Sequence, residues 1–108
     1  MEKVVFNFEK LMVYQKSLDF MDVVYQTTKS FSKDELYNLT SQFKRASLSI
    51  CLNISEGHGE TDKQFNRFLK IASHSTKECV TCSTVARRQG YISEDVDNSL
   101  RVKLEELS

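Results

Sequence analysis

Apolar residues recur every three or four positions along most of the chain, which is the spacing of one face of an α-helix. The first such run predicts a helix over about 8–30. We expect it to start at Asn7, whose side chain can cap a helix while Phe6 and Leu11 form a hydrophobic staple. Its repeating positions are Leu11, Tyr14, Leu18, Met21, Tyr25 and Thr28.

Two capping boxes mark the starts of further helices, predicted over about 33–57 and 62–89. Ser32–Glu35 has the Ser-x-x-Glu pattern, and Thr61–Gln64 has the related Thr-x-x-Gln pattern. The apolar seam of the second helix is Leu36, Leu39, Phe43, Ala46, Ile50, Asn53 and Gly57. The seam of the third is Phe65, Phe68, Ala72, Ser75, Cys79, Cys82 and Ala86.

A short last helix is predicted over about 94–107, capped by Ser93 after Gly90 has ended the third helix. Its apolar side consists of Val96, Leu100, Leu104 and Leu107. The glycine turn at 57–59 makes the second and third helices antiparallel, and small residues of one seam face large residues of the other. Because two helices cannot cover their own apolar faces, the pattern predicts an all-α protein, an antiparallel up-and-down four-helix bundle forming a single domain over 1–108.

The composition removes several classes of function. The 15 Lys and Arg residues balance 15 Asp and Glu residues, so the molecule has no overall field that would attract nucleic acid, and any such attraction must be local. Residues 31–90 hold nine basic and six acidic side chains, whereas 91–108 hold two and five. No apolar run reaches the roughly 20 residues of a membrane span, and the N-terminus lacks a secretory pattern. We therefore expect a cytoplasmic protein with no membrane contact.

No residues form a recognisable catalytic, cofactor or metal site. Cys79 and Cys82 have the spacing of a redox or metal pair, but they lie in the middle of a helix seam, which favours core packing of reduced thiols. His74 and Glu78 are four residues apart and could share a metal, yet no further histidine completes a ligand set. No motif marks a nucleophile. The sequence predicts a protein that is not an enzyme and has no cofactor.

Two polar features lie on or beside the core seam. Asn53 occupies the seam itself, where an unsatisfied carboxamide costs about 1–3 kcal/mol, and we predict that it is structural and fixes the register of the helices. Arg45 and Glu78 lie at facing positions beside the seams of the second and third helices. The pattern predicts an ion pair between them that orients the hairpin.

The outer side of the third helix carries a basic stripe. Its members repeat at the same spacing as the seam but point away from it: Lys63, Arg67, Lys70, His74 and Lys77. Phosphate backbones bind such stripes by releasing counterions. Solvated helix faces also carry Lys and Arg commonly, so these residues alone leave both interpretations open.

Several motifs together resemble one family. The stretch 37–50, followed by Asn53-Ile54-Ser55-Glu56-Gly57, closely resembles the core motif of the bacterial four-helix-bundle proteins encoded in intervening sequences of large-subunit ribosomal RNA genes. The similarity continues through 68–72, Ser75, Glu78 and 90–92. It covers nearly the whole chain.

The resemblance implies a helical bundle that often assembles as a ring-like homopentamer. A similar group, the accessory proteins of retroelements, works with a reverse transcriptase and RNA through basic surfaces. Carried over, this gives candidate nucleic-acid-binding residues Lys44, Arg45, Lys63, Arg67, Lys70 and Lys77. The residues predicted to be structural are Asn53, Glu56, Gly57, Ser75 and Glu78.

Two functional hypotheses follow. In the first, a homo-oligomer binds RNA through the basic stripe, which the ring repeats. In the second, a homo-oligomeric scaffold binds another protein through its last helix, with Leu100 and Leu104 as sensitive positions, and has no nucleic-acid role.

Overall fold

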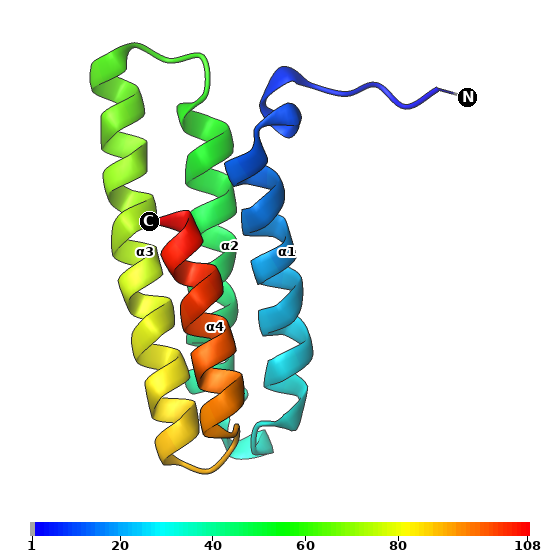
Figure 1. Ribbon diagram of the computed structural model, residues 1–108, viewed down its shortest axis with the longest axis vertical. Coiled ribbons are helices and arrows are strands. Elements are labelled where there is room, and N and C mark those ends of the chain that lie inside the picture. The colour runs from blue at the N-terminus through cyan, green and yellow to red at the C-terminus, as the bar shows by residue number, and fades with distance from the viewer. Residues whose placement is uncertain (1) are drawn as a thin grey trace.

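The structure of the protein, a computed structural model, describes residues 2–108. It contains four α-helices and, within the described residues, no strand: α1 (Met12–Thr27), α2 (Leu39–Gly57), α3 (Asp62–Arg88) and α4 (Glu94–Leu107). Successive helices run in opposite directions, and the short α4 packs against α3 and α1 (Figure 1). The predicted all-α, antiparallel up-and-down four-helix bundle is confirmed. No helix described here has the length and apolar character needed to cross a membrane.

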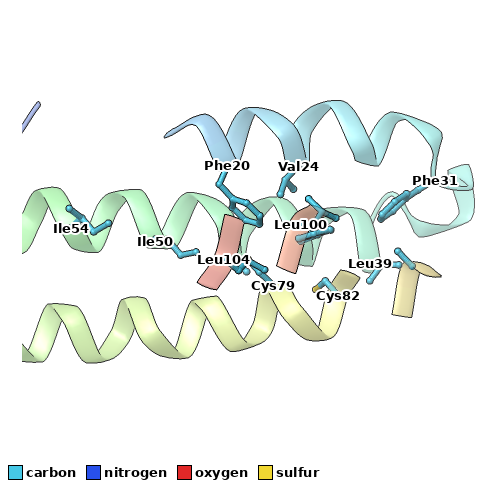
Figure 2. Packing of buried hydrophobic residues seen from close by; sticks show 13 residues of the cluster. Phe20, Val24, Phe31, Leu39, Ile50, Ile54, Cys79, Cys82, Leu100 and Leu104 are labelled. Carbon is cyan, nitrogen blue, oxygen red and sulfur yellow. The ribbon is translucent and has the colours of Figure 1, made fainter. Parts of the chain in front are cut away.

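Side chains from all four helices meet in one apolar core (Figure 2). The largest that are fully buried are Phe20, Val24, Phe43, Ile50, Cys79, Leu100 and Leu104. The predicted seams of α2 and α3 lie in this core from Leu39 to Gly57 and from Ala72 to Ala86. Phe65 and Phe68 are only half-buried, and they lie in the first two turns of α3, next to the α2–α3 turn.

Two leucines of α4 that were expected to be sensitive positions for partner binding lie in the core. Leu100 and Leu104 are each only 1% exposed, so they hold α4 on the bundle. Neither leucine can therefore contact a partner protein directly, and a change at either would act through the bundle core. The apolar residues of α4 that do reach the surface are Val96 and Val102.

The starts of α3 and α4 follow their predicted caps. The Thr61 hydroxyl oxygen accepts a hydrogen bond of 3.3 Å from the backbone N–H of Gln64, and that of Ser93 accepts one of 3.1 Å from Val96. Gly90 ends α3 with a φ of +78°, a conformation that glycine adopts without strain. Local sequence determines these three boundaries.

The first helix starts later than predicted. Residues Asn7–Lys10 form a separate 3₁₀ helix with no side-chain cap, and the extended Leu11 divides it from α1. The predicted Asn7 cap is therefore wrong. Phe8 packs edge to face on Tyr14, with ring centroids 5.2 Å apart, and this contact draws the chain into a turn before α1 begins. Thr28–Ser30 likewise form a 3₁₀ turn after α1.

The second helix also starts later than its capping box predicts. Ser32 caps only the 3₁₀ turn Lys33–Glu35, accepting from the backbone N–H of Asp34, and α2 begins at Leu39. Leu36, predicted on the seam, is 51% exposed. Phe31 enters the core instead and stacks on the Tyr91 ring, with centroids 5.4 Å apart. The buried Phe31 thus fixes the chain just before the Lys33–Glu35 turn, and the α-helix starts only at Leu39.

A buried carboxylate fastens α4 to α3. Asp97 is 5% exposed and accepts hydrogen bonds from the Ser83 hydroxyl at 2.6 Å, from Arg87 Nε at 3.1 Å and from Arg101 Nε at 3.1 Å. Burial alone would raise the pKa of Asp97, but the bonds from Ser83, Arg101 and Arg87 outweigh it and lower that pKa. The charged form of Asp97 therefore stabilises the docking of α4.

Candidate nucleic-acid interface

The basic stripe lies on the outer face of α3 and is exposed along its length, and Lys77 at its end borders a hollow shared with Leu104 and Glu105 of α4. Its members are exposed side chains that take part in no ion pair within residues 2–108: Lys63, Arg67, Lys70, His74 and Lys77. From Lys63 to Lys77 the helix rises about 21 Å, at about 1.5 Å per residue. At about 3.4 Å per phosphate along one strand, that length corresponds to roughly six phosphates.

The N-terminal half of this face is hollowed between its own side chains. Lys63, Arg67 and Lys70 border an open depression of about 540 Å³ together with Gln64 and Asn66. The two amides, which the sequence analysis did not select, add neutral donors and acceptors beside the cations. Such a surface offers charge to phosphate groups and hydrogen bonds to sugar hydroxyls.

Arg45 extends the basic face across the groove between α2 and α3. It lines a hollow with His74, Ser75 and Glu78. The predicted ion pair between Arg45 and Glu78 does not form, because Gln42 Nε2 donates to the Glu78 carboxylate at 3.2 Å. Arg45 is thus an exposed cation with no acidic partner in the described chain.

Lys44 lies on a different face of the bundle. Its ammonium group sits 4.9 Å from the centroid of the Tyr25 ring, so it points toward α1. It borders a second hollow that also holds Lys29 and Lys33, which the sequence analysis did not select. No periodic signal could have grouped these lysines, since they come from three separate segments. The structure therefore divides the predicted nucleic-acid-binding residues into a larger α3 group and the isolated Lys44.

Asn53 and Ser75, both predicted to be structural, meet through Ser49. The Asn53 amide donates to the Ser49 carbonyl oxygen at 2.8 Å and to the Ser49 hydroxyl oxygen at 3.1 Å. The Ser75 hydroxyl donates to that same hydroxyl oxygen at 2.9 Å. This chain of hydrogen bonds links α2 to α3 and satisfies the buried amide of Asn53.

Gly57 and Glu56, the other two residues of the Asn53–Gly57 motif predicted to be structural, have different surroundings. A Cβ added to Gly57 would lie 2.9 Å from the Cβ of Phe68, so glycine permits α2 and α3 to approach closely there. Glu56 is exposed and forms no ion pair within residues 2–108. Within the described residues, no ion pair supports the structural role predicted for Glu56.

The three cysteines are free and buried. Burial raises the pKa of the Cys82 thiol to about 11 and also raises the pKa values of Cys51 and Cys79. A thiol held in its protonated form is a poor nucleophile and a poor metal ligand. Within residues 2–108, no group of three or more His, Cys, Asp or Glu side chains is placed to hold a metal.

Comparison with known proteins gives a consistent family. The model of the 23S rRNA-intervening sequence protein family matches residues 9–108. A crystal structure of a protein of unknown function from the S23 ribosomal protein family of Bacteroides thetaiotaomicron superposes with a TM-score of 0.80, at 23% identity, covering 89% of this chain and 91% of that one. At that identity the superposition bears on the fold alone. No curated protein matches significantly. With nearly its whole length matched, the chain belongs to the 23S rRNA-intervening sequence protein family.

Proposed function

We propose that this protein is a non-enzymatic, cytoplasmic homo-oligomer that binds structured RNA through the outer face of α3. The observation that carries the proposal is the row of exposed basic side chains from Lys63 to Lys77, none of which forms an ion pair within the described residues. The family description names 23S rRNA, so a base-paired ribosomal RNA fragment is the first ligand to test.

The distribution of charge supports this surface over the others. The chain is neutral overall, and the acidic residues of the last segment lie on α4. One of them, Glu105, shares a hollow with Lys77, so the positive charge of the stripe is least offset toward its Lys63 end. A single basic face of this size gives modest affinity. Several copies in one ring would present several such faces to one RNA, and each further contact would form at high effective concentration.

We expect Arg67→Glu/Lys70→Glu to weaken RNA binding about tenfold or more, because two phosphate contacts become repulsive. Titration of a labelled, base-paired ribosomal RNA fragment at several salt concentrations measures this. For the wild type, the logarithm of the association constant should fall linearly with the logarithm of the salt concentration. In the double variant the magnitude of that slope should be smaller by about 2.

The matched control makes the same change in net charge at two positions outside the α3 face. Lys10→Glu/Lys103→Glu changes two exposed lysines outside the α3 face and alters the net charge equally. If RNA binds through the α3 face, this control keeps most of its affinity. Equal loss in both variants would mean that only net charge matters, and absence of binding at low salt would remove the RNA-binding role.

A second candidate function is a homo-oligomeric scaffold without a nucleic-acid role. One observation favours an interface: Leu48 and Leu52, one turn apart on the outer face of α2, are 39% and 47% exposed. The N-terminal arm adds Val4 and Phe6, which are 77% and 61% exposed. Neighbouring exposed apolar residues such as Leu48 and Leu52 are typical of contacts between protein chains.

We expect Leu48→Glu/Leu52→Glu to shift the protein toward monomer, since carboxylates on this face would have to lose water on assembly. Light scattering coupled to size-exclusion chromatography gives the mass, and Ser55→Glu is the control on the same helix. The pentamer implied by the family resemblance is the expected wild-type mass. A wild type that is already monomeric would contradict the oligomer, and unchanged mass in the double variant would place the interface elsewhere.

A further inference from the structure

A second hollow, of about 370 Å³, opens where the end of α1 meets the start of α2. Its apolar part comes from the buried Phe31 and from Leu36. Its border carries three lysines, Lys29, Lys33 and Lys44, and no acidic side chain lines it. None of the three lysines forms an ion pair within residues 2–108. The hollow therefore combines an apolar wall with unneutralised positive charge.

Thr40 adds a polar side chain to the wall of the hollow. It is 7% exposed and lines the hollow. No hydrogen bond to or from its hydroxyl group is found within residues 2–108. Every fully buried polar side-chain atom of these residues has a partner, so the Thr40 hydroxyl keeps some accessible surface, and Thr40 borders the hollow. An accessible hydroxyl on a side chain that is otherwise packed in place is suited to a bound acceptor.

The N-terminus of α2 supplies further donors at the same place. Thr40 is the second residue of α2, and the N-cap residue Asn38 makes no side-chain capping bond. The Asn38 amide donates instead to the Glu35 carboxylate, at 3.0 Å. The Glu35 carboxylate also accepts from the backbone N–H of Leu39, so the donors left without a side-chain cap are the next N–H groups of α2, which carry the positive end of the helix dipole. Anions bind at such helix ends.

Lys44 has a defined position beside these donors. It follows Thr40 by one helical turn, and its ammonium group rests 4.9 Å from the centroid of the Tyr25 ring. A cation held on an aromatic face loses less freedom on binding than a free lysine does. The anion-binding groups are therefore concentrated at the α2 end of the hollow, next to the apolar wall.

We propose that this hollow binds a nucleotide, with its phosphate at the N-terminus of α2 and its base against Phe31 and Leu36. The Thr40 hydroxyl and the Lys33 and Lys44 ammonium groups contact the phosphate. A volume of about 370 Å³ is at the small end of the range for ligand sites, which suits one nucleotide. The nucleotide can be free or can be an unpaired residue of an RNA strand, because both present the same base and phosphate.

Calorimetric titration of the full chain with adenosine 5′-monophosphate tests this site. We expect saturable binding that Thr40→Val and Lys33→Gln/Lys44→Gln each weaken about tenfold, through loss of a hydroxyl donor or of charge. Thr81→Val and Lys103→Gln, at exposed positions of α3 and α4, are the matched controls and should change affinity less than about twofold. Circular dichroism checks that every variant keeps its helical content.

Further ligands separate the parts of the proposal. Adenosine and inorganic phosphate should each bind more weakly than the nucleotide, since each lacks one of its two contacts. A short oligoadenylate tests whether the bound nucleotide belongs to an RNA strand. If the oligoadenylate binds more tightly than the mononucleotide, and Lys33→Gln/Lys44→Gln abolishes this gain, the ligand is an RNA strand. If the two bind with equal affinity, the ligand is a free nucleotide.

Three results would overturn the site: no binding of the mononucleotide, binding that the Thr40 and lysine variants leave unchanged, or adenosine or phosphate binding as tightly as the nucleotide. Arg67→Glu/Lys70→Glu should leave mononucleotide binding intact. The experiment therefore distinguishes loss of RNA binding at the α3 face from loss of nucleotide binding at this hollow.

Discussion

Phe43→Ala is expected to destabilise the protein by about 3–5 kcal/mol, the largest effect of any single substitution considered. Phe43 is 0% exposed and packs against Phe31, with ring centroids 6.4 Å apart. Truncation removes its buried apolar surface and leaves a cavity that four tightly packed helices cannot close. Because a domain of this size is stable by only about 5–15 kcal/mol, the variant should be close to unfolding.

Equilibrium unfolding in urea, followed by far-ultraviolet circular dichroism, measures this loss. With a slope of about 1–3 kcal/mol per molar urea, the midpoint should fall by about 2 M. Tyr37→Ala is the matched control, because Tyr37 is 92% exposed and its removal should cost less than about 0.5 kcal/mol. Similar losses in both variants would contradict the core assigned to Phe43.

Asp97→Ala is expected to destabilise the protein by about 2–3 kcal/mol, through the loss of α4 docking. The substitution leaves the Ser83 hydroxyl buried without its acceptor. The side chains of Arg87 and Arg101 are 37% and 41% exposed, so water takes over much of their solvation and keeps the cost below that of a fully buried pair. Asp95→Ala is the control, since Asp95 is an exposed acid in the same first turn of α4.

The same network predicts how stability depends on pH. Because the folded pKa of Asp97 is lowered, its contribution is present above the unfolded value of about 4 and is lost as the pH falls through the folded pKa. The difference in unfolding free energy between the wild type and Asp97→Asn should therefore narrow from pH 7 to pH 3. A difference that stays constant over this range would show that the charge of Asp97 does not contribute.

Local signals predicted those parts of the fold that local chemistry controls. Thr61 and Ser93 cap α3 and α4 as expected, and the α2 and α3 seams enter the core. The start of α2 could not be predicted, because Phe31 stacks on Tyr91 and the Tyr91 hydroxyl donates to Glu35 at 3.0 Å, from 56 residues away. Phe31 and Glu35 therefore make tertiary contacts, and the Ser32–Glu35 capping box does not start α2.

The candidate sites show the same division. The α3 stripe lies on one helix, so helical periodicity alone identified it. The Asp97 network could also have been found, because Asp97 precedes Leu100 and Leu104 at spacings of three and seven and so lies on the buried side of α4. The hollow beside Thr40 could not, since its lysines come from segments that only the folded chain brings together.

The most direct test of RNA binding by the α3 face is lysine labelling read by mass spectrometry, with and without a base-paired ribosomal RNA fragment. Lys63, Lys70 and Lys77 are exposed and should lose reactivity when RNA is bound, while the exposed Lys10 and Lys103 should keep theirs. Protection confined to Lys10 and Lys103, or no protection of any lysine under conditions where RNA is bound, would contradict the assignment of the RNA-binding surface to α3.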